Sequence, residues 1–230
     1  MLKIVVPYRN REKYLREGIE LWPLYFDWIK EDYKIYIIEQ DNNDIFNISK
    51  LMNIGFDISK PVPKEDSFVF LPVDHYPACG PWSFNCNYQE FKILWPYTLT
   101  YEQRILHLAH QFFESKNFGF KSYSCCPSVY KDIGGSPEDF PLGFDDSLLI
   151  NKVSKKIGFN NMYMEQFPCV AYHISGPDDE GQFSRQSFKE AFFESASKDH
   201  LPDFISDIGQ RYRIKKSISY TNKIEHFFTD

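Results

Sequence analysis

The sequence predicts an α/β fold built on a mostly parallel sheet. Short apolar runs at 3–6, 34–38 and 68–71 alternate with helix-like stretches at 12–30 and 45–56. A β-α-β-α-β order of this kind gives parallel strands with helices on both faces of the sheet. Ionisable residues also follow several of the apolar runs, and ligands bind at the carboxyl ends of the strands in open α/β sheets. These two observations together predict a ligand site at one edge of the sheet.

Composition favours one globular domain. The chain has 230 residues, of which 43% are hydrophobic and 18% aromatic, enough for a sizeable core. No domain boundary or internal repeat is visible, so we expect a single domain over residues 1–230. A formal charge of −6 gives no electrostatic reason to bind bulk nucleic acid or an anionic membrane. We therefore expect no nucleic-acid partner.

The cysteines and the first residues bear on the compartment. The five cysteines form no C-x-x-C pair, so a structural zinc site is not predicted. The first apolar run, at residues 3–6, enters a turn and is too short for a signal peptide or a membrane span. The expectation is a cytoplasmic protein with no membrane span.

Two arginines follow the first expected strand. We expect this strand to end at Pro7 and to be followed by Arg9, Arg11 and a helix from residue 12. Arginines beside a helix N-terminus are placed to meet an anion, although a solvated charged turn is the simpler alternative. The next helix, at 45–56, is expected to stop near Gly55.

An acid and an imidazole follow the third expected strand. The run at 68–71 should end at Pro72, which cannot donate to a sheet ladder. Asp74 and His75 would then stand at the carboxyl end of the strand as candidate metal ligands. An Asp-His turn that merely caps the strand is an equally acceptable interpretation.

The second half contributes further ionisable groups. We expect Asp145 and Asp146 at the N-terminus of a helix reaching residue 156, where a structural cap is the simplest role for an acid. A strand at 162–172 would end in His173. The remaining expected elements are a strand at 118–126, a short helix at 127–133, helices at 102–115 and 185–197, a loop at 176–182, and strands at 212–218 and 222–228.

One chemical scheme uses all of these groups. A divalent metal held by Asp74 and His173 would neutralise a diphosphate, and the two arginines would hold the nucleotide. A carboxylate from Asp145 or Asp146 would take a proton from an attacking hydroxyl. That reaction is sugar transfer from a nucleotide-sugar, and from spacing alone it is one interpretation among several.

Several motifs resemble the β-1,4-galactosyltransferases of glycosyltransferase family 7. Pro7-Tyr8-Arg9-Asn10-Arg11 resembles the opening motif of that family, and residues 37–40 and 45–56 match its next block at the same spacing. Residues 70–74 resemble the family's strand ending in Asp-Val-Asp. Later and weaker similarities lie at 134–152, 169–173 and 212–225. The resemblance therefore touches most of the chain.

The resemblance implies a GT-A fold, a single domain with a central mixed, mostly parallel sheet flanked by helices. Residues 1–77 would form the nucleotide-binding half and residues 78–230 the acceptor and catalytic half. The implied activity is that of an inverting hexosyltransferase that moves a sugar from a UDP-sugar to a carbohydrate hydroxyl. Mn²⁺ or Mg²⁺ would be the metal cofactor, and a carbohydrate or glycoconjugate the acceptor.

The resemblance also implies individual roles. The residues that would contact the nucleotide or the donor are Pro7, Arg9, Arg11, Phe46 and Val73. Asp74 and His173 would bind the metal, and His75 is a further candidate ligand. Asp146 falls on the catalytic base and Asp145 on the preceding acceptor-binding acid.

The chain departs from the family pattern at four positions. Pro72 replaces the first acid of Asp-Val-Asp, and Ile48 replaces a nucleotide-binding arginine. Val170 replaces a metal-binding methionine, and Leu142 replaces a tryptophan that shapes both sugar sites. The sequence therefore leaves the donor sugar and the acceptor open. A non-catalytic protein that binds carbohydrate or nucleotide-sugar on the same scaffold, and a nucleotidyltransferase that releases pyrophosphate, are the alternatives.

Overall fold

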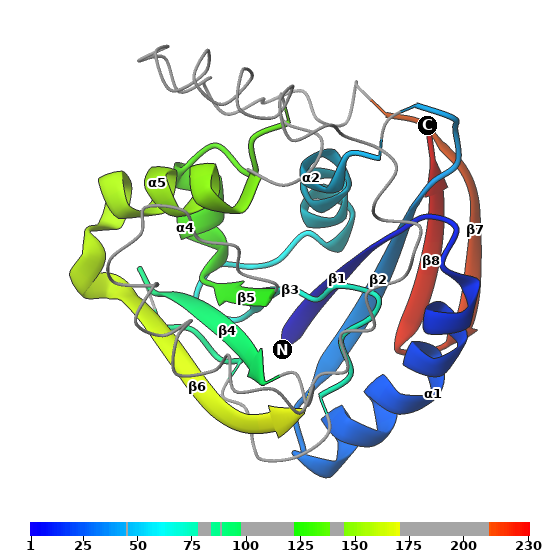
Figure 1. The fold of residues 1–230 in the computed structure, drawn as a ribbon, viewed down its shortest axis with the longest axis horizontal. Helices are drawn as coiled ribbons and strands as arrows, with labels where there is room; N and C mark the ends of the chain where they lie inside the picture. Colours follow the sequence, from blue (N-terminus) through cyan, green and yellow to red (C-terminus); the bar gives the residue numbers. More distant parts are fainter. Residues whose placement is uncertain (45, 78–83, 88, 98–121, 139–144, 171–211) are drawn as a thin grey trace.

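The computed structural model describes the chain except at residues 45, 78–83, 88, 98–121, 139–144 and 171–211 (Figure 1). Within the described part, eight strands form one sheet in the order β6-β4-β5-β3-β1-β2-β8-β7. Their bounds are β1 Leu2–Tyr8, β2 Tyr33–Gln40, β3 Ser67–Phe70, β4 Phe91–Tyr97, β5 Ser122–Cys125, β6 Met162–Val170, β7 Ile214–Thr221 and β8 Ile224–Thr229.

The sheet is mixed and mostly parallel, as the sequence predicted. β3, β1, β2 and β8 pair in parallel, and so do β4 and β6. β5 runs antiparallel to both β3 and β4, and β7 runs antiparallel to β8. The described sheet thus has six strands in one direction and two in the other.

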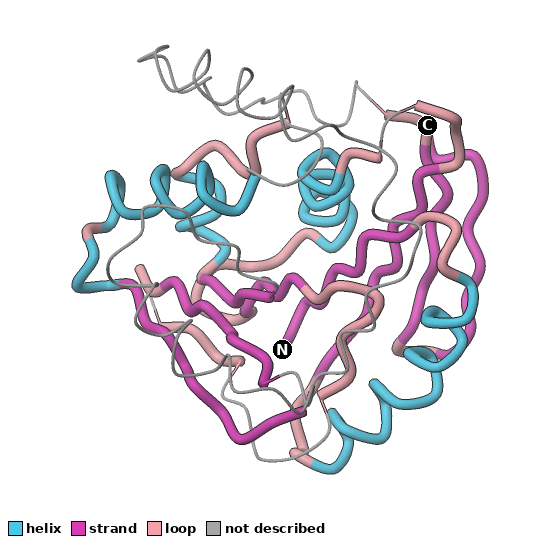
Figure 2. The backbone as a smooth tube through the Cα atoms, viewed as in Figure 1, coloured by secondary structure: helices cyan, strands magenta, loops and turns pink. Residues whose placement is uncertain are grey.

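Helices cover both faces of the sheet (Figure 2). Their bounds are α1 Glu12–Trp28, α2 Ile48–Ser59, α4 Pro127–Asp132 and α5 Asp145–Ile157, with a short 3-10 helix at Phe159–Asn161. α1 packs on one face, in a core with Leu2, Ile4 and Val6 of β1. α2, α4 and α5 pack on the other face, in a core that contains Val5. None of the helices described here is both long and apolar enough to cross a membrane.

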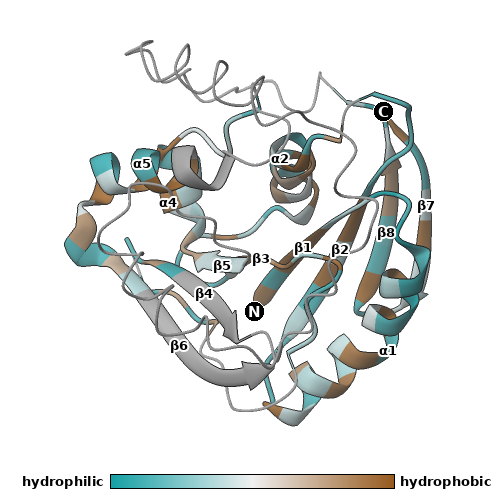
Figure 3. Cartoon of the chain, in the orientation of Figure 1, coloured by the Kyte–Doolittle hydropathy of each residue, from teal (hydrophilic) through white to brown (hydrophobic). Residues whose placement is uncertain are grey.

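The central strand β1 is apolar on both faces because helices cover both of them (Figure 3). The prediction that this strand ends at Pro7 is wrong. β1 continues to Tyr8, and Pro7 pairs with Ile38 of β2. The pairing of β1 with β3 stops at Val5, so Pro7 has a ladder neighbour on one side only. A proline is tolerated where no second ladder needs its missing N–H group.

The second helix also differs from its prediction. α2 starts at Ile48 after Asn47, whose side chain accepts a 2.9 Å hydrogen bond from the Lys50 N–H group. It continues past Gly55 to Ser59 and ends at Lys60, which has a left-handed backbone. A Cβ atom at Gly55 would lie 2.3 Å from Val5 Cγ1. The glycine therefore permits the close approach of α2 to β1 and does not stop the helix.

Most of the other described elements confirm their predictions, with small shifts at their ends, whereas β4 and the 3-10 helix were not predicted. β5, α4, α5, β6, β7 and β8 occupy the expected stretches, and Gly134 and Gly135 close α4 with φ angles of 76° and 70°. The expected helices at 102–115 and 185–197 and the loop at 176–182 lie outside the described residues.

Replacing Gly55 with alanine should destabilise the protein, because the new methyl group would overlap Val5 in the contact between α2 and β1. We expect a loss of about 1–3 kcal/mol in the free energy of unfolding, larger than the helix propensity that alanine gains. Urea unfolding followed by circular dichroism measures it. The double variant Gly55→Ala with Val5→Ala should lose less than the sum of the two single losses. A single Gly55→Ala variant more stable than the wild type would contradict this packing.

Candidate functional site

Several of the residues singled out by sequence gather at the carboxyl edge of the parallel strands. Arg9 and Arg11 follow β1, residues 41–47 follow β2, and residues 73–75 follow β3. Because these strands run in the same direction, their ends meet at one edge of the sheet (Figure 1). The end of β8, with Asp230 after it, lies at the same edge beside β2. The edge therefore brings groups from four strands together.

Arg9 and Phe46 form a cation–aromatic pair at this edge. The guanidinium carbon of Arg9 lies 5.0 Å from the centre of the Phe46 ring. Arg9 also donates a hydrogen bond to the main-chain carbonyl of Asp44. Partial burial lowers the pKa of Arg9 below its usual value, since leaving water disfavours the charged form. The pair presents a planar cation and an aromatic ring, which suit an aromatic base and a phosphate.

Arg11 and Asp74 form an ion pair across the same edge. Arg11 Nη1 lies 3.1 Å from Asp74 Oδ2, and the Asp74 side chain is only 4% exposed. A buried carboxylate needs a compensating cation, and here the arginine supplies one. A divalent metal ion that takes carboxylate oxygens could compensate the same charge. Asp74 thus has the chemistry of a metal ligand and lies where the sequence placed it.

The segment around Asp74 is fixed by its neighbours. Val73 and His75 are both buried. The His75 Nδ1 atom lies 3.0 Å from the Ser122 Oγ atom of β5, and the His75 carbonyl accepts a 2.9 Å hydrogen bond from Trp22 Nε1 of α1. These contacts attach His75, the residue next to Asp74, to α1 and to β5. Nothing in them tests His75 as a metal ligand, so that role stays a prediction.

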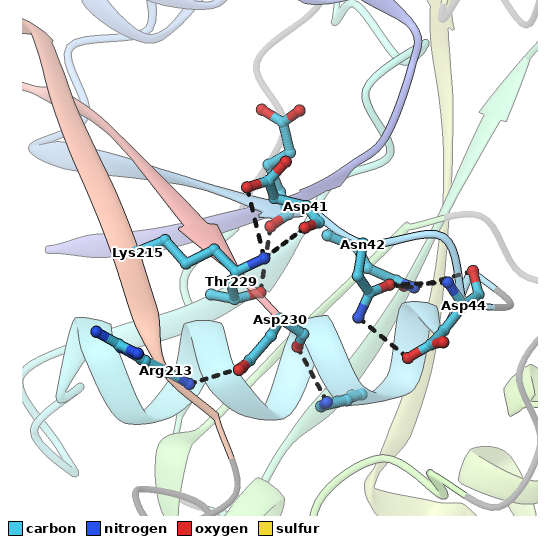
Figure 4. Close-up of polar contacts among 10 residues, drawn as sticks. Asp41, Asn42, Asp44, Arg213, Lys215, Thr229 and Asp230 are labelled. Carbon is cyan, nitrogen blue, oxygen red and sulfur yellow. Dashed lines mark hydrogen bonds and ion pairs between the residues drawn. The ribbon is translucent and has the colours of Figure 1, made fainter.

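The C-terminal hairpin, formed by β7 and β8, braces residues 41–47, which we call the β2 turn (Figure 4). Lys215 Nζ donates a 2.6 Å hydrogen bond to the Asp41 carbonyl and lies 3.6 Å from the Asp41 carboxylate. The Asp41 N–H group donates to the Thr229 carbonyl at 2.7 Å. Lys50 Nζ of α2 donates to the Asp230 main-chain oxygen at 3.0 Å. The hairpin therefore holds both the β2 turn and the start of α2.

Two asparagines, one that caps α2 and one within it, connect the site to the second half of the chain. Asn53 Nδ2 donates to the Ser136 carbonyl at 3.0 Å and to Glu138 Oε1 at 2.7 Å. Asn53 Oδ1 accepts from the Ser136 N–H group at 2.9 Å and from the Tyr130 hydroxyl at 2.6 Å. Asn47 Nδ2 donates to the Glu138 carbonyl at 2.8 Å. These bonds fix the segment that leads toward α5.

The expected catalytic and metal residues of the second half are placed only in part. Asp145 and Asp146 are the first two residues of α5, as expected, but their side chains lie outside the described part of the chain. His173 lies outside it as well. Among the residues described, no three His, Cys, Asp or Glu side chains gather closely enough to share a metal ion. Asp74 is thus the one predicted ligand whose charge and position support such a role here.

Sequence reasoning missed Gln40, Asn47 and Asn53, which organise the site without being ionisable. Asn47 could have been found as a helix cap, since asparagine is favoured there, but the expected start at residue 45 hid it. Asn53 stands among apolar residues of α2 and is buried. A polar residue at a core position of a helix is a sign of a buried hydrogen-bond network.

The sequence comparisons agree with this geometry. Residues 1–87 match the family model for the N-terminal region of glycosyl transferase group 7. β-1,4-Galactosyltransferase 1 of Bos taurus is 31% identical over 149 residues, which cover 59% of this chain and 34% of the relative. The Mus musculus protein of the same name is 34% identical over 87 residues, covering 36% of this chain and 21% of the relative. The matched segments thus span about a fifth to a third of the length of these curated relatives.

The structural comparison covers nearly the whole chain. The catalytic domain of Drosophila β1,4-galactosyltransferase 7, solved in complex with xylobiose, superposes with a TM-score of 0.66 at 14% identity. The match covers 99% of this chain and 92% of that one. A mutant of the same enzyme, solved with manganese, UDP-Gal and xylobiose, matches with the same TM-score. The chain has the GT-A fold and resembles the β-1,4-galactosyltransferases, as its motifs implied.

Replacing Asn53 with alanine should cost much more stability than an asparagine substitution elsewhere. The change would leave the Ser136 main chain and the Tyr130 hydroxyl buried with fewer partners, so we expect a loss of about 2–4 kcal/mol. Urea unfolding measures this loss. The control is Asn161→Ala, which removes one bond from a half-buried amide to the Ile157 carbonyl. Equal losses in the two variants would contradict the central place of Asn53.

Proposed function

We propose that this chain is an inverting glycosyltransferase that moves a hexose from a UDP-sugar to a carbohydrate hydroxyl with the help of a divalent metal ion. The observation that carries the proposal is the placement of Arg9, Phe46 and Asp74 at one carboxyl edge of a GT-A sheet. Similarity to an enzyme whose structure was solved with manganese, UDP-Gal and xylobiose supports the same substrate classes.

The first half would bind the nucleotide. Arg9 and Phe46 would contact the nucleotide together, as a planar cation that lies on an aromatic ring. Arg11 would turn from Asp74 toward the diphosphate, whose oxygens suit a guanidinium group. Pro7 would line the nucleotide site, and Val73 would lie beside the donor. The buried position of Val73 supports a role in shaping that site rather than in direct polar recognition.

The metal would be Mn²⁺ or Mg²⁺, held by Asp74 and His173, with His75 as a further candidate. When bound, such an ion neutralises the negative charge of a diphosphate leaving group. The buried carboxylate of Asp74 supports this assignment, because the same position already stabilises one positive charge from Arg11.

The second half would supply the base. Asp146 would take the proton from the acceptor hydroxyl as the new bond to the sugar forms, and Asp145 would bind the acceptor. Both residues open α5, and the N-terminus of a helix favours negatively charged side chains. The bonds from Asn47 and Asn53 to the segment before α5 would keep this helix in register with the nucleotide half.

The second candidate is a non-catalytic protein that binds nucleotide-sugar or carbohydrate on the same scaffold. Pro72 and Val170 favour it, since they stand where the family has an acid and a metal-binding methionine. Turnover assays with a panel of UDP-sugars and manganese distinguish the two candidates. UDP binding without turnover of any donor would favour the second candidate.

Replacing Asp146 with asparagine should abolish transfer and spare nucleotide binding. An amide cannot accept the proton, so we expect kcat to fall at least about 100-fold while the Kd for UDP changes little. Initial rates and calorimetric titration with UDP measure the two quantities. The control is Asn151→Asp, an opposite exchange at an exposed position of the same helix, which should retain activity. Turnover retained by Asp146→Asn would remove this residue from the role of base.

Replacing Asp74 with asparagine should remove the effect of manganese on UDP binding. In the wild type we expect manganese to strengthen UDP binding about tenfold or more, since Asp74 would help to hold an ion that offsets the negative charge of the diphosphate. Titration calorimetry with and without MnCl₂ measures this effect. The control is Asp27→Asn, which also removes an acid paired with a cation, Lys223, but on α1. A manganese effect that survives in Asp74→Asn would show that Asp74 is not a ligand.

A further inference from the structure

Gln40, the last residue of β2, is a buried amide that uses both of its ends. It is 6% exposed. Its Nε2 atom donates to the Asn42 Oδ1 atom at 2.8 Å and to the Asp44 carbonyl at 3.2 Å. Its Oε1 atom accepts from the Asn47 N–H group at 2.9 Å. The side chain therefore bonds both to Asn42 and Asp44 in the first part of the β2 turn and to Asn47 at its end.

The bonds from Gln40 bracket the nucleotide-binding pair. The Asp44 carbonyl that receives a bond from Gln40 also receives one from Arg9. Phe46 directly precedes Asn47, which Gln40 holds at the end of the β2 turn. Gln40 thus holds the Asp44 carbonyl to which Arg9 bonds. It also holds Asn47, the residue next to Phe46, whose ring Arg9 covers.

The turn reinforces this arrangement with its own side chains (Figure 4). Asn42 Oδ1 accepts from the Asp44 N–H group at 3.1 Å, and Asn42 Nδ2 donates to Asp44 Oδ2 at 3.2 Å. Asn42 Oδ1 is the same atom that Gln40 binds. Gln40 therefore orients Asn42, which in turn orients Asp44.

Only an amide of this length serves all three contacts. The two bonds from Nε2 need a donor, and the bond from Asn47 needs an acceptor. A carboxylate would keep the acceptor and lose both donated bonds, and an apolar side chain of equal length would lose all three. The Asp44 carbonyl and the Asn47 N–H group would then be left with fewer partners.

We propose that Gln40 is a positioning residue for nucleotide recognition: it holds the β2 turn so that Arg9 and Phe46 are pre-assembled for the nucleotide. This inference rests on the proposed function, because it concerns the same site. A loop that is ordered before binding does not have to be ordered by the ligand, and affinity is higher for that reason. Gln40 acts through Arg9 and Phe46 and itself touches no substrate in this scheme.

A double-mutant cycle tests the proposal. The test compares the Kd for UDP with MnCl₂, from titration calorimetry, in four proteins: the wild type, Gln40→Met, Arg9→Met and the double variant. We expect Gln40→Met and Arg9→Met each to raise the Kd about tenfold. Because Gln40 acts through Arg9, we expect the double variant to bind less than about threefold more weakly than Arg9→Met alone.

A control variant separates positioning from general stability. Asn161→Ala removes an amide that donates at 2.7 Å to the Ile157 carbonyl, just before β6 and five strands away from β2 in the sheet. Thermal unfolding is followed for every variant. Asn161→Ala should lower the Tm and leave the Kd for UDP unchanged. A Gln40→Met variant with the same behaviour would overturn the proposal, because Gln40 would then act on stability alone.

Other outcomes would overturn this inference, either alone or together with the proposed function. Additive effects in the cycle would overturn a role for Gln40 through Arg9. A normal Kd in Gln40→Met with a raised Kd in Arg9→Met would overturn this inference and leave the proposed function intact. An unchanged Kd in Arg9→Met, or a wild type that does not bind UDP, would overturn both.

Discussion

The parallel pairing of β1 with β2 and β3 is the constraint on which the rest of this structure depends. It aligns the three strands so that the turns after them meet at one edge. It also requires helices on both faces, which is why β1 carries apolar side chains in both directions. Without this alignment Arg9, Phe46 and Asp74 would be three separate surface residues.

Hydrogen bonds of neutral amide side chains position the site together with its ion pair. The ion pair between Arg11 and Asp74 balances a buried carboxylate, but it orients only those two side chains. Asn47 and Asn53 bind the segment before α5, and each donates to and accepts from main-chain groups that are buried or half-buried. Bonds of this kind lose much of their value when one partner is removed, because the other remains buried. Hydrogen bonds of these neutral amides therefore join the two halves of the chain, in addition to the ion pairs between the C-terminal hairpin and the first half.

The sequence predicted the elements whose signals are local. The apolar runs of β1, β2 and β3 and the ionisable residues after them were found at nearly the right positions, because each is visible within a few residues. Pro7, Gly55 and Asn53 were misjudged or missed, because their meaning depends on residues far away. Gly55 leaves room for the Val5 side chain, and Asn53 forms hydrogen bonds to Ser136. These partners lie too far away in the sequence to form part of any local pattern.

The placement of β8 next to β2 has a consequence for folding. The two strands are separated by more than 180 residues of chain, yet they pair along most of their length, and β7 and β8 supply the lysine and the carbonyl that brace the β2 turn. Contacts so distant in sequence form slowly, since a long loop must close before they contribute. During synthesis the first half of the sheet would leave the ribosome with the outer edge of β2 exposed. Unpaired strand edges promote association between chains, so the chain is exposed to aggregation during this interval.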